Sequence, residues 1–281
     1  MTKRTKLQVE HTFRFEGALL NYRIVGQGRP VVLLHGSIVA DVWDGFEKVL
    51  GKHYMVYLPE LPGFGASEAV EGQLHNTDLF AKAFAEFLEY TNLKSAPIIA
   101  FSLGTVVAIK AAAMHKSNGE LILVGMPVRL ESKLLQRVVQ MPLAARRALA
   151  TSELARGGIL LSILKDVIGT ADRGFTLKYL SLLKTSDIRA MVDGDLTLEV
   201  EKELPWFLSR ATNKMHFIYG EYDKLRSWAD KMLGREIIVI GGAGHDIFVS
   251  KPEKTLGILQ RILDRSPSIW EKIWGWWKKP I

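Results

Sequence analysis

The sequence predicts an α/β fold, in which a mostly parallel sheet of eight strands is flanked by helices and carries an inserted helical cap. Three observations support this prediction. Apolar, strand-like runs alternate with helical patterns from residue 30 to residue 125, as in a parallel sheet covered on both faces. The alternation stops over residues 126–213, where we find helical patterns and no clear strand. It then resumes with two strand-like runs and a final helix.

This pattern divides the chain into three predicted parts. Residues 1–125 and 214–266 form the core, residues 126–213 form a helical cap over one end of the sheet, and residues 267–281 form a tryptophan-rich tail. A chain of 281 residues can bury a sizeable core, either as one large domain or as a domain with an insertion.

The eight strands are placed by their apolar or alternating side chains. The first two are expected to form an antiparallel hairpin, and the others are short apolar runs typical of strands buried on both faces. The predicted strands are Thr12–Phe15, Leu19–Val25, Pro30–Gly36, Tyr54–Pro59, Pro97–Ala100, Glu120–Gly125, Met215–Tyr219 and Glu236–Ile240.

Helical periodicity is clearest over Thr77–Tyr90, where apolar residues recur on one face and Thr77 is a suitable N-cap. The other helices expected in the core are Trp43–Leu50, Leu103–Ala113 and Pro252–Leu263. Those expected in the cap are Ser132–Val139, Gly158–Val167, Phe175–Leu183 and Leu196–Leu208.

The composition is that of an ordinary globular protein, with 48% hydrophobic and 24% charged residues. The absence of cysteine excludes disulfides and cysteine metal sites and fits a reducing compartment. The amino terminus lacks the apolar segment of a signal peptide, and no run is long enough to span a membrane, so we expect a cytoplasmic protein. The net charge of +7 comes from scattered lysines and arginines without a basic-aromatic motif, which predicts no nucleic-acid partner.

Ser102 lies between a predicted strand and a predicted helix, in the sequence Ala100-Phe101-Ser102-Leu103-Gly104. This is GxSxG with alanine at the first glycine. A serine at such a turn exposes its hydroxyl, and the N–H of Leu103 and the positive end of the helix dipole face any anion that forms beside it. The alternative is an ordinary strand-to-helix turn in which Ser102 caps the helix.

A nucleophilic serine needs a base and an acid, which we expect at the carboxyl ends of other parallel strands. His245 follows the last strand in a glycine-rich segment and is the predicted base. Asp223 follows the strand before it and is the predicted acid, with Glu221 and Asp230 as rivals.

His35, Gly36 and Ser37 close the third strand. Gly36 allows the chain to fold back tightly, so that the N–H groups of Ser37 and Leu103 can serve together as the oxyanion hole. His35 precedes the apex of this loop and is better placed to anchor the loop than to act as a base.

These residues resemble the alpha/beta-hydrolase superfamily, in the branch of serine hydrolases and esterases with a helical cap. The order serine, aspartate, histidine is that of the superfamily. Two departures are Glu60, where relatives usually have aspartate, and Ala100. The motifs that carry the resemblance are LLHGS at 33–37, LPGFGAS at 61–67, AFSLG at 100–104, YGEYD at 219–223 and GGAGH at 241–245.

The resemblance implies a hydrolase of carboxylic esters that works through a Ser102–His245–Asp223 triad. Serine argues for acyl chemistry, because dehalogenases and epoxide hydrolases of this fold have aspartate at the same position. We expect a small ester substrate, apolar in its acyl or alcohol group, and neither cofactor nor metal. A carbon–carbon bond hydrolase or acyltransferase of the same fold, or a non-catalytic ligand-binding protein on this scaffold, stays open as an alternative.

The carboxyl-terminal tail places Trp270, Trp274 and Trp277 on one face of a short helix, with lysines largely elsewhere. Tryptophan and lysine on an amphipathic helix suit peripheral contact with a membrane or with a partner protein. The alternative is that this face packs against the protein's own core domain.

Overall fold

The computed structural model describes residues 10–37, 40–115, 117–128, 200–232 and 234–265, with scattered positions between 137 and 190. These residues form a sheet of eight strands in the order β1-β2-β4-β3-β5-β6-β7-β8. The strands are β1 (Glu10–Phe15), β2 (Ala18–Gly26), β3 (Pro30–Leu34), β4 (Met55–Pro59), β5 (Ile98–Phe101), β6 (Leu121–Val124), β7 (Met215–Gly220) and β8 (Ile237–Ile240).

The pairing of the strands confirms the predicted fold class. β1 and β2 form the antiparallel hairpin, and β2 also pairs antiparallel with β4. The pairs from β4 through β3, β5, β6 and β7 to β8 are all parallel. The loops that follow β3, β5, β6, β7 and β8 therefore leave the same edge of the sheet, where the predicted site residues are expected to gather.

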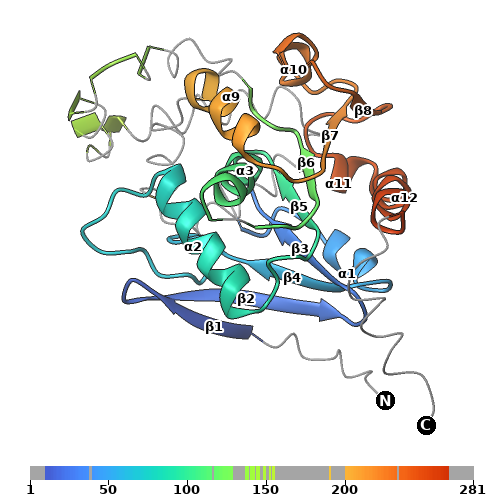
Figure 1. The fold of residues 1–281 in the computed structure, drawn as a ribbon, viewed down its shortest axis with the longest axis horizontal. Helices are drawn as coiled ribbons and strands as arrows, with labels where there is room; N and C mark the ends of the chain where they lie inside the picture. Colours follow the sequence, from blue (N-terminus) through green and yellow to red (C-terminus); the bar gives the residue numbers. More distant parts are fainter. Residues whose placement is uncertain are drawn as a thin grey trace.

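Helices cover both faces of the sheet (Figure 1). Helices α2, α3 and α9 lie on one side, and α1, α11 and α12 lie on the other. None of the described helices is both long and apolar enough to cross a membrane. The helices are α1 (Phe46–Leu50), α2 (Thr77–Tyr90), α3 (Leu103–His115), α9 (Val200–Arg210), α10 (Arg226–Met232), α11 (Ile247–Ser250) and α12 (Pro252–Leu263).

Much of the predicted cap and the whole predicted tail lie outside the described residues. This applies to the helices expected at Gly158–Val167 and Phe175–Leu183, to nearly all of Ser132–Val139, and to the tryptophans of the tail. Helix α9 overlaps the cap helix predicted at Leu196–Leu208.

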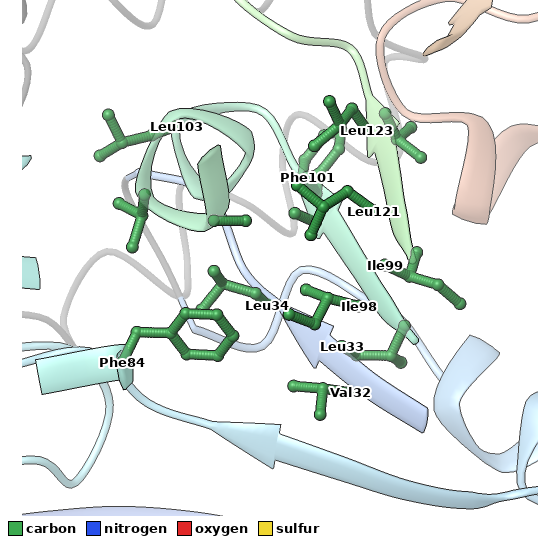
Figure 2. Packing of buried hydrophobic residues seen from close by; sticks show 14 of the residues in the cluster. Val32, Leu33, Leu34, Phe84, Ile98, Ile99, Phe101, Leu103, Leu121 and Leu123 are labelled. Carbon is green, nitrogen blue, oxygen red and sulfur yellow. The ribbon is translucent and has the colours of Figure 1, made fainter. Parts of the chain in front are cut away.

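The centre of the core lies where β3, β5 and β6 run side by side (Figure 2). These strands are apolar on both faces because helices cover both. Phe84 of α2 and Leu103 of α3 belong to the same cluster. The labelled strand residues, each at most 2% exposed, are Val32, Leu33, Leu34, Ile98, Ile99, Phe101, Leu121 and Leu123.

The start of α1 and the cap of α2 differ from the prediction, whereas α2 spans Thr77–Tyr90 as predicted. Helix α1 begins at Phe46 and not at Trp43, because Asp44 and Gly45 have φ angles of 50° and 89°, which a right-handed helix does not allow. Helix α2 is capped by Asn76 and not by Thr77. The side-chain oxygen of Asn76 accepts a hydrogen bond of 2.9 Å from the N–H of Leu79, as an N-cap residue does.

Lys110, on the helix that follows Ser102, is a buried charge that joins three helices. Its side chain is 2% exposed, and its ammonium donates to Thr77 Oγ1 and Asp78 Oδ1, each at 2.8 Å, and forms an ion pair with Glu203 Oε2 at 2.7 Å. The ring of Phe207 lies 4.8 Å from the same nitrogen. Two hydrogen bonds and two carboxylates therefore compensate the ammonium, as a buried charge requires.

Replacing Lys110 should destabilise the protein according to how much of the side chain is removed. We expect Lys110→Ala to lower the free energy of unfolding by about 3 kcal/mol, because it removes the hydrogen bonds and leaves a cavity. Lys110→Met should cost less than half of that, since it fills the space and leaves two partly exposed carboxylates that water can reach. Urea unfolding measures both values.

The control for this prediction is Lys82→Ala, which removes a lysine paired with Glu16 on an exposed part of α2. Exposed ion pairs contribute little, so this variant should unfold near the wild-type urea midpoint. Equal losses for Lys82→Ala and Lys110→Ala would contradict the role assigned to the buried ammonium.

Candidate active site

Ser102 occupies a strained turn at the carboxyl end of β5. Its φ angle is +50°, a left-handed conformation that costs a non-glycine residue roughly 1–2 kcal/mol. Hydrogen bonds on both sides hold this conformation. The N–H of Ser102 donates to the carbonyl of Val124 at 2.9 Å, and the carbonyl of Ser102 accepts from the N–H and the hydroxyl of Thr105 at 2.9 and 2.6 Å. A serine held in such a strand-to-helix turn presents its hydroxyl away from both elements.

The loop after β3 lies directly against this turn, and two glycines make the approach feasible. A Cβ atom at Gly36 would lie 2.9 Å from Ser102 Cβ, and one at Gly104 would lie 2.3 Å from the carbonyl oxygen of His35. Because Gly36 touches Ser102, the next residue, Ser37, begins beside the serine. This arrangement favours Ser37 and Leu103 as the predicted pair of oxyanion donors.

His35 uses both ring nitrogens to hold loops together. Nδ1 donates to the carbonyl of Gly36 at 2.7 Å, and Nε2 accepts from the N–H of Leu61 at 3.0 Å. Burial lowers the pKa of His35 to about 4, and the hydrogen bond to Gly36 only partly offsets that effect. His35 is therefore neutral at pH 7, and neither nitrogen is available to take a proton from Ser102.

Glu60, one of the two departures from the family pattern, closes the loop that begins at Leu61. Its Oε2 accepts from the N–H of Ala66 at 2.7 Å, and its carbonyl accepts from the hydroxyl of Ser67 at 2.7 Å. Burial raises the pKa of Glu60, and the bond from Ala66 opposes this rise. The glutamate thus anchors a loop that is itself fixed to His35.

His245 and Asp223 form a buried pair between the loops after β8 and β7. Nδ1 of His245 donates to Oδ2 of Asp223 at 2.8 Å, and Oδ1 of Asp223 accepts from the N–H of Leu225 at 3.0 Å. Their side chains are 7% and 1% exposed. With Nδ1 protonated and bound, Nε2 is the nitrogen left to accept a proton.

The pKa of His245 lies above the usual histidine value. Burial is the strongest influence and lowers this pKa, but the charge and the hydrogen bond of Asp223, together with the charge of Asp246, outweigh it. The site therefore stabilises an imidazolium ion, which is the species formed when a histidine takes a proton from serine.

The two rival carboxylates have other partners. Oε2 of Glu221 accepts from the N–H of Gly242 at 2.7 Å, so Glu221 supports the loop that carries His245. Asp230 pairs with Arg226 on the exposed surface of α10 at 3.4 Å. The geometry thus favours Asp223 as the acid.

Gly125, at the end of β6, lies against the histidine–aspartate pair and was not singled out from the sequence. A Cβ atom there would lie 2.6 Å from Cε1 of His245, 2.8 Å from its Nδ1 and 3.3 Å from Oδ2 of Asp223. The φ angle of Gly125 is +59°. The only signal in the sequence is a glycine directly after an apolar strand.

Gly125→Ala should displace the imidazole and lower kcat by about 100-fold, because misplacing a catalytic group by about 1 Å has an effect of that size. The matched control is Gly234→Ala, since Gly234 has nearly the same φ of +55° but no atom of the described residues within 4 Å of the added Cβ. Both variants carry the backbone strain, and only the first carries the contact with His245. Equal kcat values for the two variants would contradict a positioning role for Gly125.

The structure thus brings His245, Asp223 and Gly125 together, and it packs the loop of Ser37 against the turn of Ser102. Phe101, whose ring contacts His245, was also not recognised from the sequence. Among the described residues, no group of three or more histidine, aspartate or glutamate side chains could hold a metal ion. Trp270, Trp274 and Trp277 lie outside the described residues, so their contact with a membrane or partner stays a prediction.

Comparisons with known proteins agree with this architecture. The sequence model of the alpha/beta hydrolase family matches residues 31–257. A pimeloyl-[acyl-carrier protein] methyl ester esterase of Aeromonas hydrophila is 26% identical over 264 residues, which cover 85% of this chain and 96% of that protein. The enzyme of the same name from Aeromonas salmonicida is 36% identical over 88 residues, which cover 31% of this chain and only 33% of that protein.

Among solved structures, a thermophilic esterase from Thermogutta terrifontis is similar with a TM-score of 0.71 and 19% identity. The alignment covers 92% of this chain and 98% of that one. At this identity the likeness concerns the fold.

Proposed function

Because the chain belongs to the alpha/beta hydrolase family, we propose that it hydrolyses carboxylic esters through an acyl-enzyme on Ser102. The observation that supports this most directly is the buried hydrogen bond of 2.8 Å between His245 and Asp223, which fixes the imidazole with Nε2 free. The strained turn of Ser102 supplies the second part, because a serine in this conformation has an exposed hydroxyl.

In the first half of the proposed reaction, His245 Nε2 takes the proton of the Ser102 hydroxyl while Oγ attacks the ester carbonyl. The N–H groups of Ser37 and Leu103 stabilise the oxygen that becomes negative. When the tetrahedral intermediate collapses, the bond to the alcohol breaks and the leaving oxygen receives the proton from Nε2. Asp223 remains a carboxylate and holds the imidazolium in place.

In the second half, water replaces the alcohol. His245 takes a proton from the water as its oxygen attacks the acyl carbonyl, and the same N–H groups bind the second oxyanion. Collapse then breaks the bond to Ser102 Oγ, which receives the proton back, and the carboxylic acid leaves. Each half moves one proton through Nε2, so the raised pKa of His245 suits both.

The related esterases suggest the first substrates to test. Their name specifies the methyl ester of an acyl chain carried by a protein, so esters of an apolar acyl group with a small alcohol are the proposed class. The predicted apolar substrate agrees with this choice.

Labelling with a fluorophosphonate probe tests the proposal, because a serine activated by a neighbouring base attacks the phosphorus of the probe, displaces fluoride and forms a stable phosphonate ester. We expect labelling of the wild type on the peptide that contains Ser102, and hydrolysis of nitrophenyl and methyl esters in a chain-length series. If the folded protein neither reacts with the probe nor hydrolyses any ester of the series, the proposed function is wrong.

A further inference from the structure

The ring of Phe101 lies against the imidazole of His245. The two ring centroids are 4.8 Å apart and the planes are inclined by 36°, so the rings are closer to parallel than to perpendicular. Phe101 is the last residue of β5, directly before Ser102, and is 2% exposed. The residue next to the nucleophile in the sequence therefore contacts the base in space, although no sequence pattern connects positions 101 and 245.

The Phe101 ring is itself fixed by other aromatic rings. Phe248 meets it nearly at right angles, with centroids 5.6 Å apart and planes at 86°, and Trp43 lies 6.4 Å away. Phe248 also contacts Trp43 and Phe46, at 5.0 and 5.1 Å. Aromatic groups in such edge-to-face contacts hold one orientation, so Phe101 presents a fixed ring to His245.

Three sides of the His245 imidazole contact neighbouring groups. Nδ1 is bound to Asp223, the Cε1 edge lies against the backbone of Gly125, and one face lies against Phe101. The Nε2 edge is the direction in which a proton can be exchanged. Without Phe101 the imidazole would keep its hydrogen bond but could tilt about it.

We propose that Phe101 is a positioning residue, which holds the imidazole of His245 for proton transfer and stabilises its protonated form. This rests on the proposed function for the proton transfer, but the stabilisation itself is a property of the resting protein. Phe101 is too buried to contact a substrate, so its effect reaches the reaction only through His245.

The physical reason is the charge distribution of the aromatic ring, whose face is electron-rich and attracts a cation. The neutral imidazole gains only stacking, whereas the imidazolium gains stacking and this attraction. The charged groups that act on His245 are Asp223, from the loop after β7, and Asp246, from its own loop. Like these two carboxylates, Phe101 favours the protonated imidazole. It does so through the electron-rich face of its ring and adds no negative charge.

Titration of the His245 imidazole by NMR tests this directly, with the signal assigned by its loss in His245→Gln. We expect Phe101→Leu to lower the pKa of His245 by about half a unit to one unit, and Phe101→Tyr to restore most of that change because it keeps the ring. The matched control is Phe84→Leu, which makes the same substitution at another buried phenylalanine of the same core (Figure 2). The ring of Phe84 stacks on Phe87 of its own helix. The His245 pKa of this variant should equal that of the wild type.

The titration needs no substrate, so its result is independent of whether the protein hydrolyses esters. With an ester substrate, Phe101→Leu should also lower kcat roughly ten-fold while KM changes little. Equal His245 pKa values in Phe101→Leu and the wild type would overturn the proposal, as would an equal decrease in Phe84→Leu.

A second series keeps the proposal testable if Phe101→Leu does not fold. Ring-fluorinated phenylalanines placed at position 101 alone keep the shape of the side chain and withdraw electron density from its face. The His245 pKa should fall step by step as fluorines are added. A pKa that stays constant across the series would show that the ring does not stabilise the imidazolium and would overturn the proposal.

Discussion

Replacement of Ser102 by alanine should lower kcat for an ester substrate by on the order of a million-fold, while KM changes little. The loss is this large because no bond to the acyl group can form, and His245 and Asp223 cannot act without the hydroxyl. Some acceleration over water should remain, since the oxyanion donors and the binding surface are unchanged. Fluorophosphonate labelling should disappear in the same variant.

The control is Ser209→Ala on α9, where the hydroxyl is exposed and donates to the carbonyl of Trp206 within the helix. This variant should keep wild-type turnover and labelling. If Ser102→Ala retained wild-type kcat, the nucleophile would have to be another residue and the triad would be wrong.

Asp223→Asn should lower kcat by about 10,000-fold, because asparagine presents a donor where Nδ1–H of His245 needs an acceptor and the imidazole is left in the wrong tautomer. The pH dependence should change as well. Activity of the wild type falls when the pH drops through the pKa of His245, since the base must be neutral. Asp223 raises that pKa, so its loss should move the acidic limb of the kcat profile to lower pH.

Glu221→Gln provides the comparison for the acid. Glu221 lies two residues away and its carboxylate supports Gly242 in an exposed position, so the change should cost at most a few-fold in kcat and leave the acidic limb in place. A larger loss in Glu221→Gln than in Asp223→Asn would assign the acid to Glu221.

The parallel part of the sheet could be predicted from the sequence because its strands are short apolar runs, which helices cover on both faces. Thr77–Tyr90 and Pro252–Leu263 begin and end where the patterns predicted, whereas the strand expected over Pro30–Gly36 ends earlier, at Leu34. The start of α1 could not be predicted, because it depends on the φ angles of Asp44 and Gly45. The predicted N-cap residue of α2 was wrong, because both Asn76 and Thr77 are good N-cap residues and only the folded backbone determines which one faces Leu79.

The residues of the candidate site also divide into those that a sequence pattern indicates and those that it does not. Ser102, Asp223 and His245 could be proposed from the sequence because each follows an apolar strand, in an order that the superfamily shares. Gly125 and Phe101 could not, because their importance lies in contacts with His245 across more than a hundred positions of sequence. Lys110 in a run of small apolar residues gives no indication that its partners come from two other helices.

The contacts of Lys110 also affect where the predicted cap insertion could be cut and replaced by that of a related protein. Glu203 and Phe207 of α9 contact the same ammonium as Thr77 of α2, so α9 is joined to the helix that begins after Ser102. A chimera whose crossover lies between α9 and β7 would replace Glu203 and Phe207 with foreign residues and leave the buried ammonium of Lys110 to Thr77 and Asp78 of α2. A crossover before Val200 keeps α9 with Lys110, and it is the boundary at which a transplanted insertion should leave the turn of Ser102 undisturbed.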